Sequence, residues 1–149
     1  MHHTRTIDQL AAALIDLISF LNSPQRDDVL LREAGVDLDR ALFPLLVRLG
    51  RSGSLSVAGL ADQVGRDHTT ISRQLSKLER RGLISRQGGG ADRRVRTASL
   101  TAAGDKIVQA ITAARRRLLS RALAEWSEAD LAALATLNQR FVDALEAMT

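Results

Sequence analysis

The sequence contains no cysteine and no tyrosine, and only 3% of its residues are aromatic. Without cysteine the chain has no disulfide framework, no thiolate metal site and no thiol redox sensor. No apolar run approaches the roughly 20 residues that a membrane span requires. The amphipathic segment TIDQLAAALIDLISFL carries two aspartates, which argues against a secretory signal peptide. We therefore expect a soluble protein of the cytoplasm with no membrane partner.

The sequence is instead rich in aliphatic residues. Of its 149 residues, 45% are hydrophobic, so a globular fold is expected. This length is enough for one domain with a real core. Leucine, alanine, isoleucine and valine provide most of the apolar surface, and these residues suit the packing of helices better than a β-sandwich. The composition thus favours a single, mainly α-helical domain.

Positive charge is concentrated in the middle of the chain. Residues 51–101 contain ten Lys or Arg and four Asp or Glu, a net charge of +6. The remaining residues contain 11 basic and 13 acidic side chains, a net charge of −2. A basic centre between slightly acidic ends is typical of a protein that binds nucleic acid.

The first third of the chain has the apolar spacing of helices. Residues 5–21 form an amphipathic pattern, and Pro24 ends it, because the residue before proline avoids the helical region. Residues 25–34 are expected to form one or two loose turns. Asp37 is expected to cap a helix that runs to about residue 49, with a kink or a break at Pro44.

Two short helices joined by a tight turn follow. Ser56 is expected to cap a helix over 57–64, and Gly65 to end it in a left-handed conformation. Asp67 is then expected to cap a second helix over 68–81. The apolar face of that helix is spaced i, i+4, i+7 and consists of Ile71, Leu75 and Leu78.

A β-hairpin is predicted next. Residues 83–86 read as a strand, Gly88 to Gly90 as a flexible tip, and 94–100 as an alternating return strand. Two helices, over about 102–126 and 128–148, complete the chain. Two helices, a tight turn and a hairpin in this order predict a winged helix-turn-helix. This module lays its second helix in a DNA major groove.

The helix over 68–81 is therefore the candidate recognition helix. Its polar side chains opposite the apolar face are the predicted DNA contacts: His68, Thr69, Thr70, Ser72, Arg73, Gln74 and Lys77. Arg73 can bind guanine through two hydrogen bonds, and Gln74 can pair with adenine. His68, at the helix start, is placed to contact phosphate.

The hairpin is the second candidate contact. Its predicted DNA-binding residues are Arg86, Asp92, Arg93, Arg94 and Arg96. An arginine at a glycine-rich tip can enter the minor groove, where the negative potential is enhanced. Asp92 is expected to hold an arginine side chain in place by a charge-assisted hydrogen bond.

Three helical patterns have broad apolar faces, over residues 7–21, 107–123 and 131–145. A single winged module cannot cover all three. Unburied apolar stripes of this extent usually indicate a partner, so the sequence predicts a homodimer built from its terminal helices.

The sequence resembles that of the MarR family of bacterial transcription regulators. The resemblance is strongest from Asp67 to Arg73 and from Leu78 to Ile84. It continues in a wing pattern, D-x-R-x5-LT-x2-G, which here begins at Asp92 and ends at Gly104. In this pattern Arg94 matches the wing arginine of the family, and Asp92 matches the acid that positions it.

The resemblance implies a mainly α-helical winged helix-turn-helix with a small β-hairpin wing and interlocked terminal helices. Residues 1–149 would form one domain, with dimerisation helices over 5–34 and 102–148 and the DNA-binding region over 37–101. The implied function is a homodimeric repressor of its own and neighbouring genes, bound to a pseudo-palindromic operator. A small phenolic or aromatic acid bound between these regions would act as inducer.

Two other functions stay open from the sequence. The same charge would serve a non-specific, architectural DNA-binding protein. Carboxylates could serve a metal-responsive regulator, although three histidines without cysteine make a poor ligand set. An enzyme is not expected, because no phosphate-binding, dinucleotide-binding or HExxH motif is present. The sequence likewise predicts no cofactor and no metal site.

Overall fold

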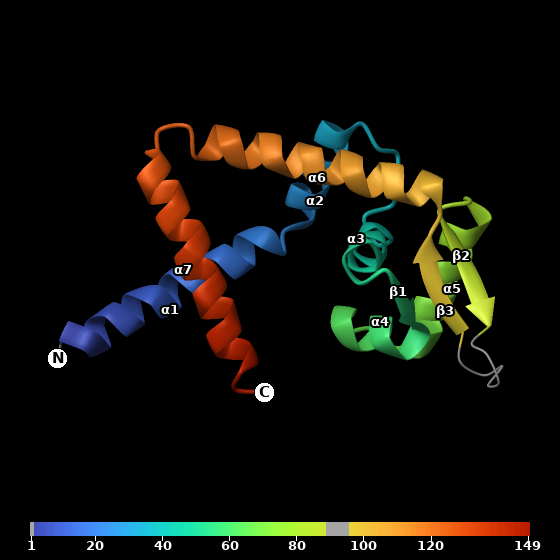
Figure 1. The fold of residues 1–149 in the computed structure, drawn as a ribbon, viewed down its shortest axis with the longest axis horizontal. Coiled ribbons are helices and arrows are strands. Elements are labelled where there is room, and N and C mark those ends of the chain that lie inside the picture. The colour runs from blue at the N-terminus through green and yellow to red at the C-terminus, as the bar shows by residue number, and fades with distance from the viewer. Residues whose placement is uncertain (1, 89–95) are drawn as a thin grey trace. The chain divides into compact units, whose positions relative to one another are not determined.

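The structure is a computed structural model that describes residues 2–88 and 96–149. The chain is mainly helical, and segments from the middle of the sequence form a small sheet (Figure 1). In order, the elements are α1 (His2–Leu21), α2 (Pro24–Ala34), α3 (Phe43–Ser52), β1 (Ser54–Ser56), α4 (Val57–Val64), α5 (His68–Arg80), β2 (Ile84–Gly88), β3 (Arg96–Leu100), α6 (Ala102–Ala122) and α7 (Glu128–Glu146).

The chain forms two compact units. The first, Met1–Ala114, contains the sheet, helices α1 to α5 and the first part of α6. The second, Arg115–Thr149, contains the end of α6 and the whole of α7.

The sheet has three antiparallel strands in the order β1-β3-β2. The hairpin predicted from the sequence is the β2–β3 pair, in which Arg86 lies opposite Ala98 and Gly88 opposite Arg96. Strand β1 was not predicted. It is only three residues long and pairs Ser54 with Ser99 on the other edge of β3.

The core lies in the first unit, where helices α3, α4 and α5 pack against the sheet. Eight large side chains there are fully buried: Leu45, Leu46, Leu49, Leu60, Ile71, Leu75, Leu78 and Ile111. Ile71, Leu75 and Leu78 are the apolar face that the sequence predicted for α5, and all three are buried. Among the described residues, no polar or charged residue is buried.

The start of α6 is fastened to the turn that follows α5. Thr101 donates its hydroxyl to the carbonyl oxygen of Gly82 (2.6 Å) and its amide to that of Leu83 (3.1 Å). Its hydroxyl also accepts from the amide of Gly104 (3.2 Å). A β-carbon at Gly104 would collide with the carbonyl oxygen of Leu83. Glycine at 104 therefore permits the close approach of α6 to this turn.

The segment before α3 differs from the prediction. Residues 24–34 form the regular helix α2 rather than loose turns. No helix starts at Asp37. Instead α3 begins at Phe43, and Pro44 lies in its first turn. Proline is tolerated there because a first-turn amide has no partner within the helix. The expected kink or break at Pro44 was thus wrong, because the helix simply starts later.

The terminal helices bury little within one chain. No side chain of α7 is buried, and the described side chains of α1 are all exposed or half-exposed. The exposed large hydrophobic residues include Ile15 (65%), Ile18 (56%), Leu21 (58%), Leu134 (45%), Leu137 (55%) and Leu145 (48%). Among the described helices, none is long and apolar enough to cross a membrane.

Candidate nucleic-acid interface

Helix α5 is fixed at both of its ends by the residues that the sequence predicted. The carboxylate of Asp67 accepts hydrogen bonds from the amide of Thr70 (2.8 Å) and from its hydroxyl (2.8 Å). These two bonds, the backbone bond first, hold the pKa of Asp67 below its ordinary value. At the other end Gly82 has a φ of 73° and follows the C-cap Arg81.

The predicted contacts of α5 divide into two groups. Five are exposed, namely His68, Thr69, Ser72, Arg73 and Lys77. Thr70 and Gln74 are half-buried and already have partners within the chain. Thr70 donates its hydroxyl proton to Asp67, whereas the side-chain oxygen of Gln74 accepts from Arg66 (2.8 Å). The exposed group presents hydroxyl, imidazole, ammonium and guanidinium donors to a ligand.

The hairpin contacts α5 through Arg86. Its Nη2 atom donates to the carbonyl oxygen of Ser72 at 3.2 Å. This bond joins the middle of β2 to the middle of α5, so it helps fix the hairpin relative to the helix. Of the five hairpin residues predicted to bind DNA, the structure describes Arg86 and Arg96, whereas Asp92, Arg93 and Arg94 lie outside the described residues.

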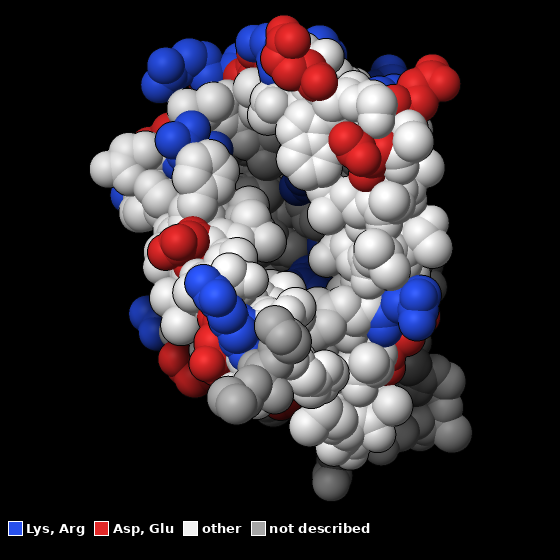
Figure 2. All heavy atoms as spheres, turned by 90° about the vertical axis from the view of Figure 1, so that its left-hand side faces the viewer, with Lys and Arg blue, Asp and Glu red and all other residues white. Residues whose placement is uncertain are grey.

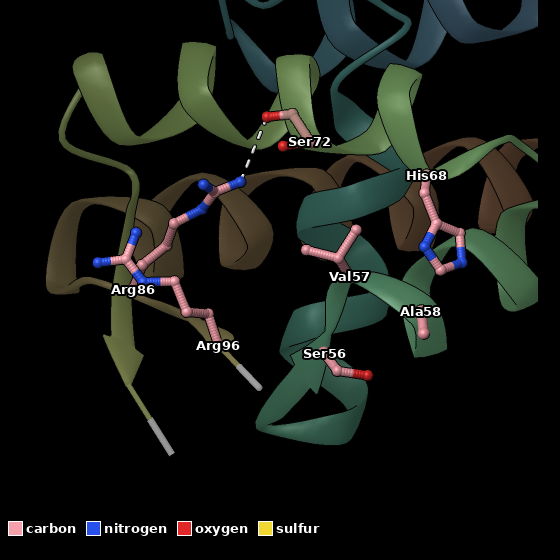
Figure 3. Close-up of a pocket in the computed structure, with 7 residues that line it drawn as sticks. All are labelled: Ser56, Val57, Ala58, His68, Ser72, Arg86 and Arg96. Carbon is pink, nitrogen blue, oxygen red and sulfur yellow. Dashed lines mark hydrogen bonds between the residues drawn. The ribbon is translucent and has the colours of Figure 1, made fainter. Parts of the chain in front are cut away.

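A cleft of about 520 Å³ separates the hairpin from α4 and α5 (Figure 3). It is lined by Ser56, Val57, Ala58, His68, Ser72, Arg86 and Arg96, none of which is acidic. In Figure 3 the two arginines reach in from the hairpin, and His68 lies on the opposite side. An anion in this cleft would meet positive charge from the hairpin.

The register of the sheet explains why the two arginines lie together. Arg86 is paired with Ala98, and Arg96 lies two residues before Ala98 on the same strand. Residues two apart on a strand point to the same face, so Arg86 and Arg96 form a diagonal pair on one face of the hairpin. Within the described residues neither forms an ion pair with a carboxylate. This arrangement favours the binding of an anion such as a phosphate group.

Sequence reasoning missed two parts of this site. One is the start of α4, where Ser56, Val57 and Ala58 line the cleft. The alternation of Ser54, Leu55 and Ser56 was the only sign of strand β1, which ends at this point. The other is Arg66, whose hydrogen bond to Gln74 joins residues eight positions apart and has no signature in the sequence.

The described residues contain no group of three or more His, Cys, Asp or Glu side chains that could hold a metal ion. The functional groups that the structure brings together are instead the exposed face of α5 and the two arginines of the hairpin. This arrangement is suited to contacts with the bases and phosphates of a duplex.

Comparison with known proteins agrees with this geometry. Residues 38–95 match the MarR family. The chain is 32% identical over 104 residues to the uncharacterized HTH-type transcriptional regulator YxaD of Bacillus subtilis, covering 70% of this chain and 73% of that protein. It is 28% identical over 102 residues to the HTH-type transcriptional repressor MdtR of the same organism, covering 68% of this chain. That match spans 66% of MdtR, slightly less than two thirds of its length.

Solved structures show the same fold. A MarR family protein from Bacillus stearothermophilus superposes with a TM-score of 0.80. The superposition covers 96% of this chain and 97% of that one, at 22% sequence identity. The helices and the three-stranded sheet described above are therefore an arrangement that occurs in known winged-helix proteins.

Proposed function

This chain belongs to the MarR family of DNA-binding transcription regulators, and from that premise we propose that it is a homodimeric repressor which reads a pseudo-palindromic operator. One observation carries this proposal: the exposed polar face of α5 and the arginines of the hairpin flank one cleft free of acidic residues. The family consists of regulators rather than enzymes. As such a regulator the protein would work in the cytoplasm, bound to the nucleoid.

In this proposal α5 lies in a major groove. Its exposed side chains contact base edges, with Arg73 bound to guanine through two hydrogen bonds. Arg86 and Arg96 contact a phosphate of the adjoining backbone in the cleft. The hairpin tip with Arg93 and Arg94 extends to the flanking minor groove, and Asp92 positions one of these arginines. These contacts combine sequence readout with salt-dependent anchoring.

The dimer would be formed by the terminal helices. Seven large hydrophobic residues of α1 are exposed in the single chain: Ile7, Leu10, Ile15, Leu17, Ile18, Phe20 and Leu21. Figure 2 views the molecule from the left-hand side of Figure 1, and most of the atoms on this face belong to uncharged residues. Apolar area of this extent favours association with a second copy. A two-fold axis then requires half-sites about one helical turn apart.

The proposal also includes release of the protein from DNA by a small phenolic or aromatic acid. Such a compound would act only if it favours a dimer in which the two copies of α5 no longer match the spacing of the half-sites. The check is a titration of salicylate against the protein–DNA complex, with benzyl alcohol as an uncharged aromatic control. If neither compound changes the dissociation constant of the protein–DNA complex, release by such a ligand is contradicted. The proposed binding to DNA is not.

Binding to DNA fragments tests the main proposal. The wild-type protein is titrated onto a labelled fragment from immediately upstream of its own gene, with an excess of unrelated duplex. Tight binding that survives the competitor, with one footprint of dimer size, is expected. Equal affinity for both duplexes would instead indicate an architectural DNA-binding protein.

Two variants separate base contacts from phosphate contacts. Arg73→Ala is expected to lose about 1–3 kcal/mol of binding energy and to relax the preference at one base pair of each half-site. Arg86→Ala is expected to weaken binding to all sequences. It should also reduce by about one the steepness with which the logarithm of the binding constant falls against the logarithm of the salt concentration. Arg140→Ala, which removes one positive charge from α7, is the matched control. Equal effects of Arg140→Ala and Arg86→Ala would contradict the assigned phosphate contact.

A further inference from the structure

His68 is the first residue of α5 and one of the residues that line the cleft between the hairpin and helices α4 and α5. In Figure 3 it lies across the cleft from Arg86 and Arg96. The residue is exposed, and within the described residues its side chain forms no hydrogen bond and no ion pair. The imidazole is therefore available to a ligand that enters the cleft.

Histidine is rare in this chain, and cysteine is absent. The three histidines are at positions 2, 3 and 68. Histidine is the side chain that ordinarily changes its charge between about pH 5 and pH 8, and perturbed cysteines and the terminal amine also titrate in this range. His68 is the only histidine beyond position 3, so a change of pH near neutrality acts on the cleft through this side chain.

The charged groups that face His68 from the neighbouring elements are positive. Strand β2 supplies Arg86 and strand β3 supplies Arg96, and both line the cleft. The lining residues from the start of α4 are uncharged. The one charged residue of α4, Asp62, is exposed and does not line the cleft. Among the described residues, the lining of the cleft therefore contains no carboxylate.

The charged residues next to His68 in the sequence are engaged elsewhere. The carboxylate of Asp67 accepts the two hydrogen bonds that cap α5. The guanidinium of Arg66 donates to two oxygens of residues that do not line the cleft. Further along α5, residues four apart share a face, so Ser72 rather than Arg73 lies on the side of His68. A protonated imidazole in the cleft would thus face two arginines and no carboxylate.

A bound phosphate would reverse this balance. Like charges nearby disfavour the protonated imidazole, whereas an opposite charge within about 4–6 Å favours it. The cleft, of about 520 Å³, is where the proposed function places a backbone phosphate. A phosphate between the two arginines and His68 would therefore stabilise the protonated form. Because linked equilibria are reciprocal, protonation of His68 would strengthen the binding of DNA by the same factor.

We propose that His68 makes DNA binding sensitive to pH, because its imidazole takes up a proton when a backbone phosphate enters the cleft. The protein then binds DNA more tightly in mildly acidic than in mildly alkaline conditions. This inference rests on the proposed function, in which the cleft receives a phosphate of the operator. Every duplex carries phosphates, so the effect of pH should appear with the operator and with unrelated DNA. Binding should also depend more steeply on salt at the lower pH, since each protonated imidazole neutralises a further phosphate.

Fluorescence anisotropy with a labelled duplex tests the proposal, at about pH 6 and about pH 8 and at constant ionic strength. The dissociation constant of the wild-type protein is expected to be about tenfold lower at the lower pH, a factor within the range typical of linked binding equilibria. His68→Gln keeps a hydrogen-bond donor but cannot take up a proton. Its dissociation constant and its salt dependence are expected to be the same at both pH values. A pH effect in His68→Gln as large as that in the wild type would overturn the proposal.

The matched control is a variant that combines His2→Gln with His3→Gln. His68 is its only histidine, and like His68→Gln it keeps the terminal amine. The control is expected to show the pH dependence of the wild type. Loss of the pH dependence in this control and its retention in His68→Gln would assign the effect to the start of the chain and contradict the proposal.

The outcomes separate this inference from the proposed function. If the wild type binds no duplex at either pH, the proposed function fails and the inference fails with it. If the wild type binds its operator equally tightly at both pH values, only the inference is overturned.

A second measurement decides if His68→Gln does not fold, as judged by its thermal unfolding. Calorimetry of DNA binding by the His2→Gln and His3→Gln variant, in two buffers of different ionisation enthalpy, gives the number of protons taken up. The titration is made at about pH 6.5, where the terminal amine is already mostly protonated. Proton uptake on binding supports the proposal, and its absence overturns it.

Discussion

Helices α5 and α7 are built by the same local rules, yet only α5 buries its apolar face. Each begins at a side chain that accepts a hydrogen bond from an amide three residues later, Asp67 in α5 and Ser127 in α7. Leu75 of α5 is fully buried, whereas Leu137 of α7 is 55% exposed. Capping and apolar spacing therefore determine that a helix forms, but a surface to pack against determines whether its side chains are buried.

The difference divides the chain into a region that completes its own core and a region that needs a partner. Helix α4 and strand β2 contact α5, and buried side chains of α3 belong to the same core cluster. Within one chain, no large side chain of α7 is covered to the same degree. Each of the following experiments tests this comparison, beginning with the largest expected effect.

Leu75→Ala should destabilise the winged module. Deleting buried methyl groups from a fully packed site costs about 2–5 kcal/mol of the free energy of unfolding. Because the cavity lies within one chain, the cost should be the same at every protein concentration. The measurement is urea unfolding at two concentrations a hundredfold apart. A cost that grows on dilution would mean that the module depends on the partner for its core.

Leu134→Glu should act on association rather than on the module. A carboxylate placed in an apolar interface is expected to raise the dimer dissociation constant at least about 100-fold, which corresponds to about 2.7 kcal/mol. Sedimentation equilibrium measures this shift. Thr136→Glu adds the same charge on the opposite side of α7 and is the control. Equal dissociation of both variants would remove α7 from the proposed interface.

Gly104→Ala tests how closely the start of α6 packs on the turn after α5, within the first unit. The added β-carbon would collide with the carbonyl oxygen of Leu83, so α6 would have to move away from the turn. Such overpacking is expected to lower the free energy of unfolding by about 1–3 kcal/mol. Thermal unfolding should show a lower Tm, whereas Ala103→Gly, at the exposed neighbouring position, should show only the small loss of helix propensity. Unchanged stability of Gly104→Ala would contradict the close packing of α6 on the turn.

Asp67→Asn should give the smallest effect, and the effect should depend on pH. The folded-state pKa of Asp67 lies below its ordinary value of 3.8, so its charge stabilises the fold above that value and stops doing so as the pH falls through the lower folded-state pKa. Asparagine keeps an oxygen for the cap but has no charge to lose. The difference in unfolding free energy between the two proteins should therefore be largest at neutral pH and vanish in acid. A difference independent of pH would contradict this account.

Local signals in the sequence predicted the helices and the hairpin of the winged module well. Ser56 and Asp67 cap α4 and α5 as expected, and Gly65 ends α4 with a φ of 67°. These features depend on residues at most four positions apart. The structure confirms the helix α5 and the hairpin for the same reason, because caps, turn glycines and apolar spacing are local.

Features that depend on distant residues were not predicted. A helix start at Asp37 was wrong, because Asp37 is outside the helix and its carbonyl accepts from Arg81, 44 positions away. Strand β1 was missed, because a strand of three residues is defined by its pairing with β3 rather than by its own composition. The roles of the wing residues Asp92, Arg93 and Arg94 stay predictions.

The sequence by itself determined which segments are helical, where the basic residues are concentrated and which family the chain resembles. Only the tertiary structure decided which of these side chains are available to a ligand. It placed Arg86 and Arg96 on one face of the hairpin, and it engaged the oxygen of Gln74 with Arg66. The physical reason is that helix caps and apolar periodicity act over a few residues. The availability of a donor or an acceptor depends on whatever side chain the fold brings beside it.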